Sequence, residues 1–380
     1  MAYWIIDISS LFYYDLYIMH KKLNLAIVGL WNCASSLIQW IAYYWAVKDD
    51  SKKIIWLMHN DIGGYFIKDI DVVAGIDVNK EKIGISIAES IFKTPNCTKI
   101  FCDKKLFKNK VIAWPVLDWI SGRMASKVKV HSIVKNLKTR KKDIVKELLD
   151  KKVDVLVSYL PVWSKEAAIF YAECALEAKI AYANAMPEFI SSNKDWAKKF
   201  ETVWIPCAWD DIKSQVWATI VHRCLVDLIN KRWEIIDGTY QLNIWWNTDF
   251  ENMLDESRLV SKRISKTEAV TSLISDYDVQ TRIWPSDFVD HLNDNKVCYI
   301  NIQWRQFWDI PFSIDVKLSV EDSPNSAWVM VDVIRLLKLA KDNGLKWYQD
   351  FSCYYFKHPM FQKQDDKWYN TVQEFIKKYS

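Results

Sequence analysis

Apolar runs of the length of buried strands alternate with amphipathic stretches through the first half of the chain. The strand-like runs are residues 25–29 (LAIVG), 71–77 (DVVAGID), 153–159 (VDVLVSY) and 180–184 (IAYAN). The stretches with apolar residues at helical spacing are residues 32–46, 80–92, 128–150 and 164–178. Regular alternation of strands and helices is typical of βαβ units. The sequence therefore predicts an α/β fold with a doubly wound parallel sheet.

The pattern changes after about residue 235, where strand-like runs follow one another with fewer helices between them. These runs are residues 240–247, 296–303 and 312–320, and an amphipathic helix is expected at 326–341. They predict a second, α+β domain with a more antiparallel sheet. The predicted organisation is an N-terminal extension at 1–20, a first domain at 21–235, a second domain at 236–340 and a C-terminal tail at 341–380 that returns to the first domain.

Composition and charge exclude several classes of protein. Of the 380 residues, 51% are hydrophobic and 26% are charged, which rules out a disordered or fibrous chain. The net charge of +4 is too small for nucleic acid to be the main partner. Eight cysteines without a CxxC pair indicate reduced thiols. Asp7 and Asp15 interrupt the aromatic run at 1–19, so we expect neither a signal peptide nor a membrane span there, and a cytoplasmic protein that starts at Met1 or Met19.

A dinucleotide-binding turn is the first candidate site. Residues 29–34 (GLWNCA) lie between the first predicted strand and helix, where a G-x-G-x-x-G/A motif belongs. Gly29 would form the tight turn, but Trp31 stands where the backbone must approach a pyrophosphate. Asp77 ends the second strand and is the candidate for the ribose hydroxyls. From these residues alone, a strand–turn–helix that binds no nucleotide is an equally good interpretation.

Nine blocks of sequence, taken in order, resemble one known family. The blocks are VGLWNCASS, LMHNDIGGY, PNCTKIFCD, NAMPEFI, DDIKSQVWATI, QLNIWWNTDFENML, SKRISKT, DNKVCYI and KLSVEDSPNSA. They closely resemble the myo-inositol-1-phosphate synthases of the short bacterial and archaeal type, from about residue 22 to about 365. The resemblance implies a Rossmann domain, an α+β catalytic and tetramerisation domain, and a C-terminal tail that returns to the first domain.

The resemblance also implies an activity. Family members hold NAD tightly and convert D-glucose 6-phosphate to 1L-myo-inositol 1-phosphate. C5 is oxidised, C6 loses a proton and attacks the C1 aldehyde, and C5 is reduced again, so that no NADH accumulates. Lysines suit such a site, because a cation stabilises each developing oxyanion and a buried lysine can act as a base. Two other functions stay open: a different NAD(P)-dependent oxidoreductase with net hydride transfer, and a catalytically inactive nucleotide-binding protein.

The family motifs point to individual residues of this sequence. The catalytic candidates are Lys213, Lys262, Lys296 and Lys357, with Asp249 and Asp294 to orient the lysines. The substrate-binding candidates are Ser214, Gln215, Asn247 and Thr248. The cofactor-binding candidates are Gly29, Trp31, Asn32, Cys33, Ala34, Asp77, Ser158, Tyr159, Pro161 and Asn184. Family members differ in using a divalent or a monovalent cation, and the six histidines show no HxH or HExxH spacing, so the metal is left unknown.

Tryptophan and glycine occur in unusual numbers. The chain has 21 tryptophans and 8 glycines, whereas average usage of ~7% would give ~27 glycines. The tryptophans that stand where the family pattern has glycine are Trp31, Trp40, Trp114, Trp119, Trp163, Trp209, Trp217, Trp245, Trp246, Trp284, Trp304, Trp308 and Trp328. Trp196 matches a tryptophan of the family. Some bacteria read the codon UGA as glycine, and a common alternative code reads it as tryptophan. We therefore expect glycine at most of these positions in the cell; the alternative is a genuinely tryptophan-rich chain with a remodelled site.

Overall fold

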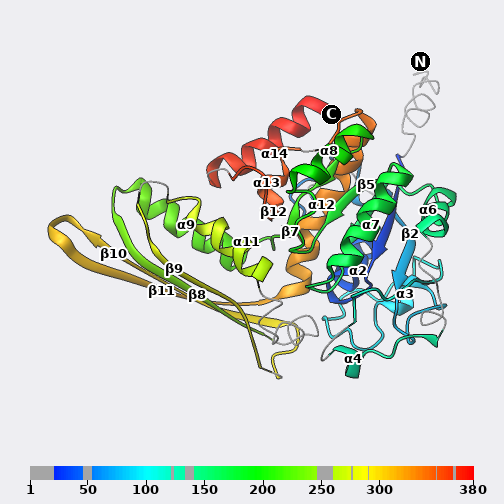
Figure 1. Cartoon of the computed structure of the whole chain (residues 1–380), viewed down its shortest axis with the longest axis horizontal. Helices are drawn as coiled ribbons and strands as arrows, with labels where there is room; N and C mark the ends of the chain where they lie inside the picture. The colour runs from blue at the N-terminus through cyan, green and yellow to red at the C-terminus, as the bar shows by residue number, and fades with distance from the viewer. Residues whose placement is uncertain are drawn as a thin grey trace, which may run out of the picture.

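Two large β-sheets, a two-stranded sheet and the helices packed on them make up the described part of the protein (Figure 1). The computed structural model describes residues 21–45, 54–120, 124–132, 141–245, 260–274, 277–289, 291–347, 349–362 and 365–380. Within those ranges, no helix is both long and apolar enough to cross a membrane.

The first sheet is parallel and, in the described part of the chain, has six strands. They are β1 (Leu23–Val28), β2 (Ile70–Asp77), β3 (Ile112–Ala113), β4 (Val155–Ser158), β5 (Ala181–Asn184) and β6 (Cys207–Ala208), in the order β3-β2-β1-β4-β5-β6. Helices cover both faces, with α2 (Asn32–Tyr44) and α12 (Asp322–Asp342) on one and α6 (Lys141–Asp150) and α7 (Lys165–Ala178) on the other. This strand order is that of a Rossmann sheet. The predicted doubly wound parallel sheet is confirmed.

Two predicted helices are shorter than the sequence pattern indicates. The helix expected at 80–92 is reduced to α3 (Ile87–Ser90), because the side chain of Asn79 accepts a hydrogen bond from the amide of Glu81 and begins a turn instead. The helix expected at 128–150 is wrong at its start, since Val130 forms a β-bridge with Asn79. Its described helical part is α6, preceded in the chain by α4 (Met124–Lys127).

The second sheet is mixed and forms the long arm on the left of Figure 1. Its strands are β8 (Ile235–Trp245), β9 (Gln280–Phe288), β10 (Asn295–Gln306) and β11 (Ile310–Glu321), in the order β11-β10-β8-β9. β10 pairs antiparallel with both β8 and β11, and β9 runs parallel to β8. The helices α9 (Ala218–Lys231) and α11 (Val260–Thr271) pack on one face over an apolar core that includes Ile229, Val270 and Ile300.

The boundaries between the two parts differ from the predicted ones. Helix α9 packs on the second sheet although it lies within the predicted first domain (21–235), because its apolar face contributes Val226 and Ile229 to that core. Helix α12 was assigned to 236–340, but its apolar side chains, among them Val333 and Leu337, join the core of the first sheet. The chain therefore leaves the first part near residue 217 and returns near 322.

The segment after α12 packs against the first part of the protein. Helix α13 (Ser352–Tyr355) leads into β12 (Phe356–His358), which pairs antiparallel with β7 (Asp210–Ile212). Helix α14 (Asp365–Tyr379) follows and places Val372 and Phe375 in the core of the first sheet. The remaining helix α8 (Lys194–Thr202) joins β5 to β6.

Candidate active site

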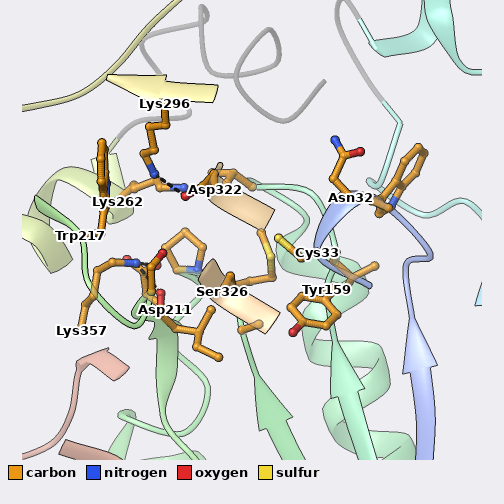
Figure 2. A pocket seen from close by; sticks show the side chains of 18 of the residues that line it. Asn32, Cys33, Tyr159, Asp211, Trp217, Lys262, Lys296, Asp322, Ser326 and Lys357 are labelled. Carbon is orange, nitrogen blue, oxygen red and sulfur yellow. Dashed lines mark hydrogen bonds and ion pairs between the residues drawn. The ribbon is translucent and has the colours of Figure 1, made fainter. Parts of the chain in front are cut away.

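A pocket lies where the first sheet, the second sheet and α12 meet (Figure 2). On the side of the first sheet it is lined by Asn32 and Cys33 at the start of α2 and by Tyr159 after β4. The strand order of the sheet reverses between β1 and β4, which is where open α/β sheets bind ligands. The charged residues of the other walls are Asp211 of β7, Lys262 and Lys266 of α11, Lys296 of β10, Asp322 of α12 and Lys357 of β12.

Carboxylates hold two of the four lysines in place. The Lys357 ammonium donates to Asp211 Oδ1 at 2.7 Å and to the carbonyl of Ile212 at 2.6 Å. Ser265 donates to the second oxygen of Asp211 at 2.8 Å. The Lys296 ammonium pairs with Asp322 at 3.0 Å. Four lysines against two carboxylates leave the pocket positively charged, which suits a substrate that carries a phosphate.

Burial and the repulsion of neighbouring lysines lower the pKa of two of these lysines, Lys266 and Lys296. Burial is the main cause that brings the pKa of Lys296 down to about 8, and the neighbouring Asp322 opposes this. Burial, together with the charges of Lys296 and Lys262, holds the pKa of Lys266 well below its usual range. The pKa of Asp211 is lowered, because the charges of Lys357 and Lys262 outweigh its burial. The pocket thus combines a stable carboxylate with lysines that lose a proton readily.

Three charged lining residues were not among the sequence candidates. Lys266 lies one helical turn after Lys262, and the i, i+4 spacing on α11 was a signal that could have found it. Asp211 is adjacent to motif residues, but its backbone has φ of 60°, which no pattern in the sequence indicates. Asp322 is the carboxylate that pairs with Lys296, whereas the sequence offered Asp249 and Asp294 to orient the lysines.

The turn before α2 has the geometry of a dinucleotide-binding turn. Gly29 has φ of 84°, and a Cβ atom there would lie 2.5 Å from the carbonyl oxygen of Tyr159. Only glycine fits this position. Helix α2 then begins at Asn32, so its first amides point toward the pocket end that Asn32 and Cys33 line. The side chain of Asn32 accepts hydrogen bonds from the amides of Cys97 and Thr98, at 2.7 and 3.2 Å.

A buried ion pair lies beneath that turn. Asp77 is fully buried; its Oδ2 accepts a hydrogen bond from the amide of Leu30 at 3.0 Å, and its Oδ1 accepts from the amides of Val78 and Asn79. The Lys82 ammonium lies 3.8 Å from Asp77 and donates to the carbonyl of Leu30 at 2.7 Å. Burial lowers the pKa of Lys82 to about 8. Asp77 therefore holds the turn. The described pocket lining does not include it, and the ribose contact expected from the sequence stays a prediction.

Several cofactor candidates support the pocket from behind its lining. Asn184 is fully buried and donates to Asp210 at 2.7 Å and to the carbonyl of Glu188 at 2.6 Å, which fixes the segment with Met186 in the pocket wall. The carbonyl of Ser158 accepts from the amide of Ala185 at 3.1 Å. Pro161 lies between two lining residues, Leu160 and Val162, and Ala34 is buried in the core with α2.

Other sequence candidates lie elsewhere. The ammonium of Lys213 donates to the carbonyl of Cys353 at 2.7 Å and lies 3.1 Å from the ring centre of Trp368, away from the lysines of the pocket. Gln215 lines a neighbouring cavity with Trp368, whereas Ser214 lines both. Asp294 accepts from the amide and hydroxyl of Ser323 at the start of α12, and burial raises its pKa to about 7. Asn247, Thr248 and Asp249 lie outside the described residues.

The described residues give no sign of a protein-built metal site. Within them, no three side chains of histidine, cysteine, aspartate or glutamate are grouped so that they could hold a metal ion. The cysteines that the structure describes are free thiols, four of which are buried in apolar surroundings: Cys102, Cys174, Cys207 and Cys298.

A Rossmann sheet, a glycine turn at the start of its first helix and a pocket of lysines facing that turn are typical of dinucleotide-dependent enzymes that act on anionic substrates. The comparisons identify the family. The model of the family described as myo-inositol-1-phosphate synthase matches residues 218–323. The chain is 43% identical over 362 residues to inositol-3-phosphate synthase of Mycolicibacterium smegmatis, covering 93% of this chain and 98% of the relative. It is 41% identical over 364 residues to inositol-3-phosphate synthase of Corynebacterium glutamicum, covering 94% and 98%. The chain belongs to the myo-inositol-1-phosphate synthase family.

A solved structure supports the fold independently. The crystal structure of a myo-inositol-1-phosphate synthase-related protein from Thermotoga maritima superimposes with a TM-score of 0.79 at 19% identity, over 94% of this chain and 98% of that chain. The two sheets and their connection, including the return of the chain through α12, therefore form a fold that is known from experiment.

Proposed function

We propose that the protein converts D-glucose 6-phosphate to 1L-myo-inositol 1-phosphate with NAD as a tightly held cofactor. The observation that carries the proposal is the meeting of Lys262, Lys266, Lys296 and Lys357, from three different elements, opposite the start of α2. Membership of the family gives the reaction, and the pocket supplies the groups that this reaction needs.

The turn and helix start fit a dinucleotide. Gly29 lets the backbone turn close to Tyr159, and the first amides of α2 and the side chains of Asn32 and Cys33 would hold the pyrophosphate. Bound NAD would take a hydride from C5 of the sugar and later return it. Trp31 caps this helix start and lines the pocket, so its indole competes for the same space.

The lysines and their carboxylates would perform the proton transfers and stabilise charge. The excess of positive charge attracts the phosphate of the substrate, and Ser214 in the lining offers a hydroxyl for a hydrogen bond. The side chain of Lys357, fixed by Asp211, can stabilise a developing oxyanion. Lys266 and Lys296 have lowered pKa values, and either can take the C6 proton as a neutral amine.

The test is product analysis. We expect the protein, incubated with glucose 6-phosphate and NAD, to form inositol 1-phosphate without accumulation of NADH. The assay uses the chain as printed and its Trp31→Gly variant, because the indole lines the cofactor end of the pocket. Lys357→Ala should lower turnover at least ~100-fold, whereas Lys146→Ala, at an exposed lysine of α6, should not. NADH formation in proportion to substrate would show that the protein is an ordinary dehydrogenase. Absence of product with both chains would favour the alternative of a catalytically inactive nucleotide-binding protein.

The second sheet supports a proposal about assembly. Its face away from α9 and α11 exposes Tyr240 and Leu242 of β8 beside Tyr299 of β10, each 39% exposed. Such a row of apolar side chains on a sheet is typical of a protein–protein interface. We expect a homotetramer in the cytoplasm that forms through this face. Sedimentation should show a smaller species for Leu242→Lys, and a monomer for the unchanged protein would contradict the proposal.

A further inference from the structure

Tryptophan occupies backbone conformations that favour glycine. In the described part of the chain, twelve non-glycine residues have a positive φ, and six of these are tryptophans. The six are Trp56, Trp163, Trp204, Trp233, Trp308 and Trp347, with φ between 50° and 77°. A bulky side chain in this region is a rare outlier, because its Cβ crowds the following carbonyl, whereas glycine adopts it freely. Tryptophan thus accounts for half of the non-glycine residues with a positive φ in the described part of the chain.

Two helix ends show the same preference in detail. Helix α9 ends in a Schellman motif, in which the amide of Trp233 bonds to the carbonyl of Asn230 at 2.9 Å and that of Glu234 to Ile229 at 3.3 Å. Helix α8 ends in the same way, with Trp204 bonded to Glu201 at 3.2 Å. The left-handed position of this motif normally holds glycine.

A third helix provides the comparison within the same chain. At the end of α12, the amide of Gly344 bonds to the carbonyl of Lys341 at 3.0 Å, and that of Leu345 to Ala340 at 2.9 Å. Gly344 has φ of 64°, the same value as Trp233. The motif is identical, so the tryptophan stands where an equivalent helix of this protein has glycine.

Buried indoles add an independent observation. A buried indole N–H normally finds a hydrogen-bond acceptor. Among the described residues, the N–H groups that are buried without an acceptor include those of Trp31, Trp40, Trp114, Trp119, Trp217, Trp304, Trp328 and Trp368. Eight such donors are many for one protein, since each forfeits about 1–3 kcal/mol on burial.

Two of these indoles stand at helix starts that face the pocket. Trp31 precedes the first residue of α2 and Trp217 precedes that of α9, and neither provides a side-chain cap. Both line the pocket. Glycine is tolerated at this capping position and would leave the helix amides open toward an anion.

We propose that the protein as made in the cell carries glycine, read from the codon UGA, at the six left-handed tryptophans and at Trp31 and Trp217. The excess of tryptophan and the deficit of glycine in the sequence then have the same cause. The assignment at the six turns depends on backbone geometry alone. The assignment at the pocket rests on the proposed function, because it supposes that the two helix starts bind phosphate groups.

The direct test is peptide mass spectrometry of the protein isolated from its native cell, together with the coding sequence. We expect peptides that carry glycine at Trp204, Trp233 and Trp31, each encoded by UGA. Trp196, which lies inside α8 with its ring 4.0 Å from the Lys199 ammonium, should be tryptophan encoded by UGG. Tryptophan masses at the first three positions would overturn the proposal, whatever the enzyme catalyses.

A second test uses the recombinant chain as printed and does not depend on activity. Trp233→Gly and Trp204→Gly should each raise the midpoint of thermal unfolding, because glycine relieves the left-handed strain at both helix ends. The matched control Trp196→Gly should lower the midpoint, because it places glycine within a helix and removes a contact with Phe200. A lower midpoint for all three variants would refute the structural argument.

Discussion

The free-energy cost of burying a charged lysine in the pocket can be measured by substituting Lys296. The residue is 6% exposed, and its burial lowers the pKa from 10.5 to about 8 although Asp322 lies 3.0 Å away. Since one pKa unit corresponds to about 1.36 kcal/mol, the charged form costs the folded protein about 3 kcal/mol at pH 7, relative to the unfolded chain. Lys296→Met keeps the length of the side chain and removes the charge. We therefore expect the variant to resist urea better than the wild type at pH 7.

The pH dependence follows from the direction of the pKa shift. Between pH 8 and 10.5 the unfolded chain keeps the Lys296 proton while the folded protein has lost it, so the stability of the wild type rises with pH in this window. At pH 9.5 the cost has fallen to about 1 kcal/mol, so the advantage of Lys296→Met should shrink by about 2 kcal/mol between pH 7 and 9.5.

Equilibrium urea unfolding at the two pH values provides the measurement. Lys146→Met, at an exposed lysine of α6, is the matched control and should show no change in its stability relative to wild type between the two values. The Lys296→Met variant should also lose at least ~100-fold in turnover, since it lacks an acid–base group of the pocket. A stability advantage that stays constant from pH 7 to 9.5 would refute the argument that Lys296 is desolvated.

Three further substitutions test other parts of the structure. Lys82→Met removes the donor to the carbonyl of Leu30 and should weaken NAD binding of the Trp31→Gly protein at least ~10-fold by calorimetry; unchanged affinity would show that the turn does not need the lysine. Lys213→Met removes the hydrogen bond to Cys353 and should lower the unfolding free energy by about 1–3 kcal/mol with turnover within a few-fold of wild type. Lost turnover at full stability would instead support the catalytic role expected from the sequence. Arg335→Met removes the ion pair at 2.6 Å from Oδ1 of the buried Asp332, which keeps only His59 and Tyr355 on its other oxygen, and should cost about 3–5 kcal/mol in urea unfolding. An unchanged midpoint would contradict this.

The strands of the first sheet could be predicted because they are buried on both faces. Their continuous apolar runs end at polar residues or glycine, so β1, β2, β4 and β5 stand out in the sequence. The helix expected at 128–150 shows the limit of the same approach. Its basic residues follow helical spacing, but the β-bridge of Val130 to Asn79 takes its first residues out of the helix. Contacts between distant segments outweigh local spacing there.

The site could be predicted only in part, for a similar reason. Motifs identified Lys262, Lys296 and Lys357, and the structure brings these lysines into one pocket. The spacing of residues within a motif does not show which of its side chains point into the pocket. In the segment that contains Lys213, the left-handed backbone of Asp211 turns the Asp211 carboxylate toward Lys357. The side chain of Lys213 points instead to the C-terminal segment, where it donates to the carbonyl of Cys353.

The return of the chain through α12 has a consequence for synthesis on the ribosome. The core that holds Leu23 and Ile27 of the first strand also holds Leu337, Phe351 and Phe375. The apolar surface of the first strand is therefore fully covered only after residues close to the C-terminus have been synthesised. We infer that α2 alone covers this face of the first sheet in the nascent chain, and that the rest of the face stays exposed until α12 and the C-terminal helices emerge.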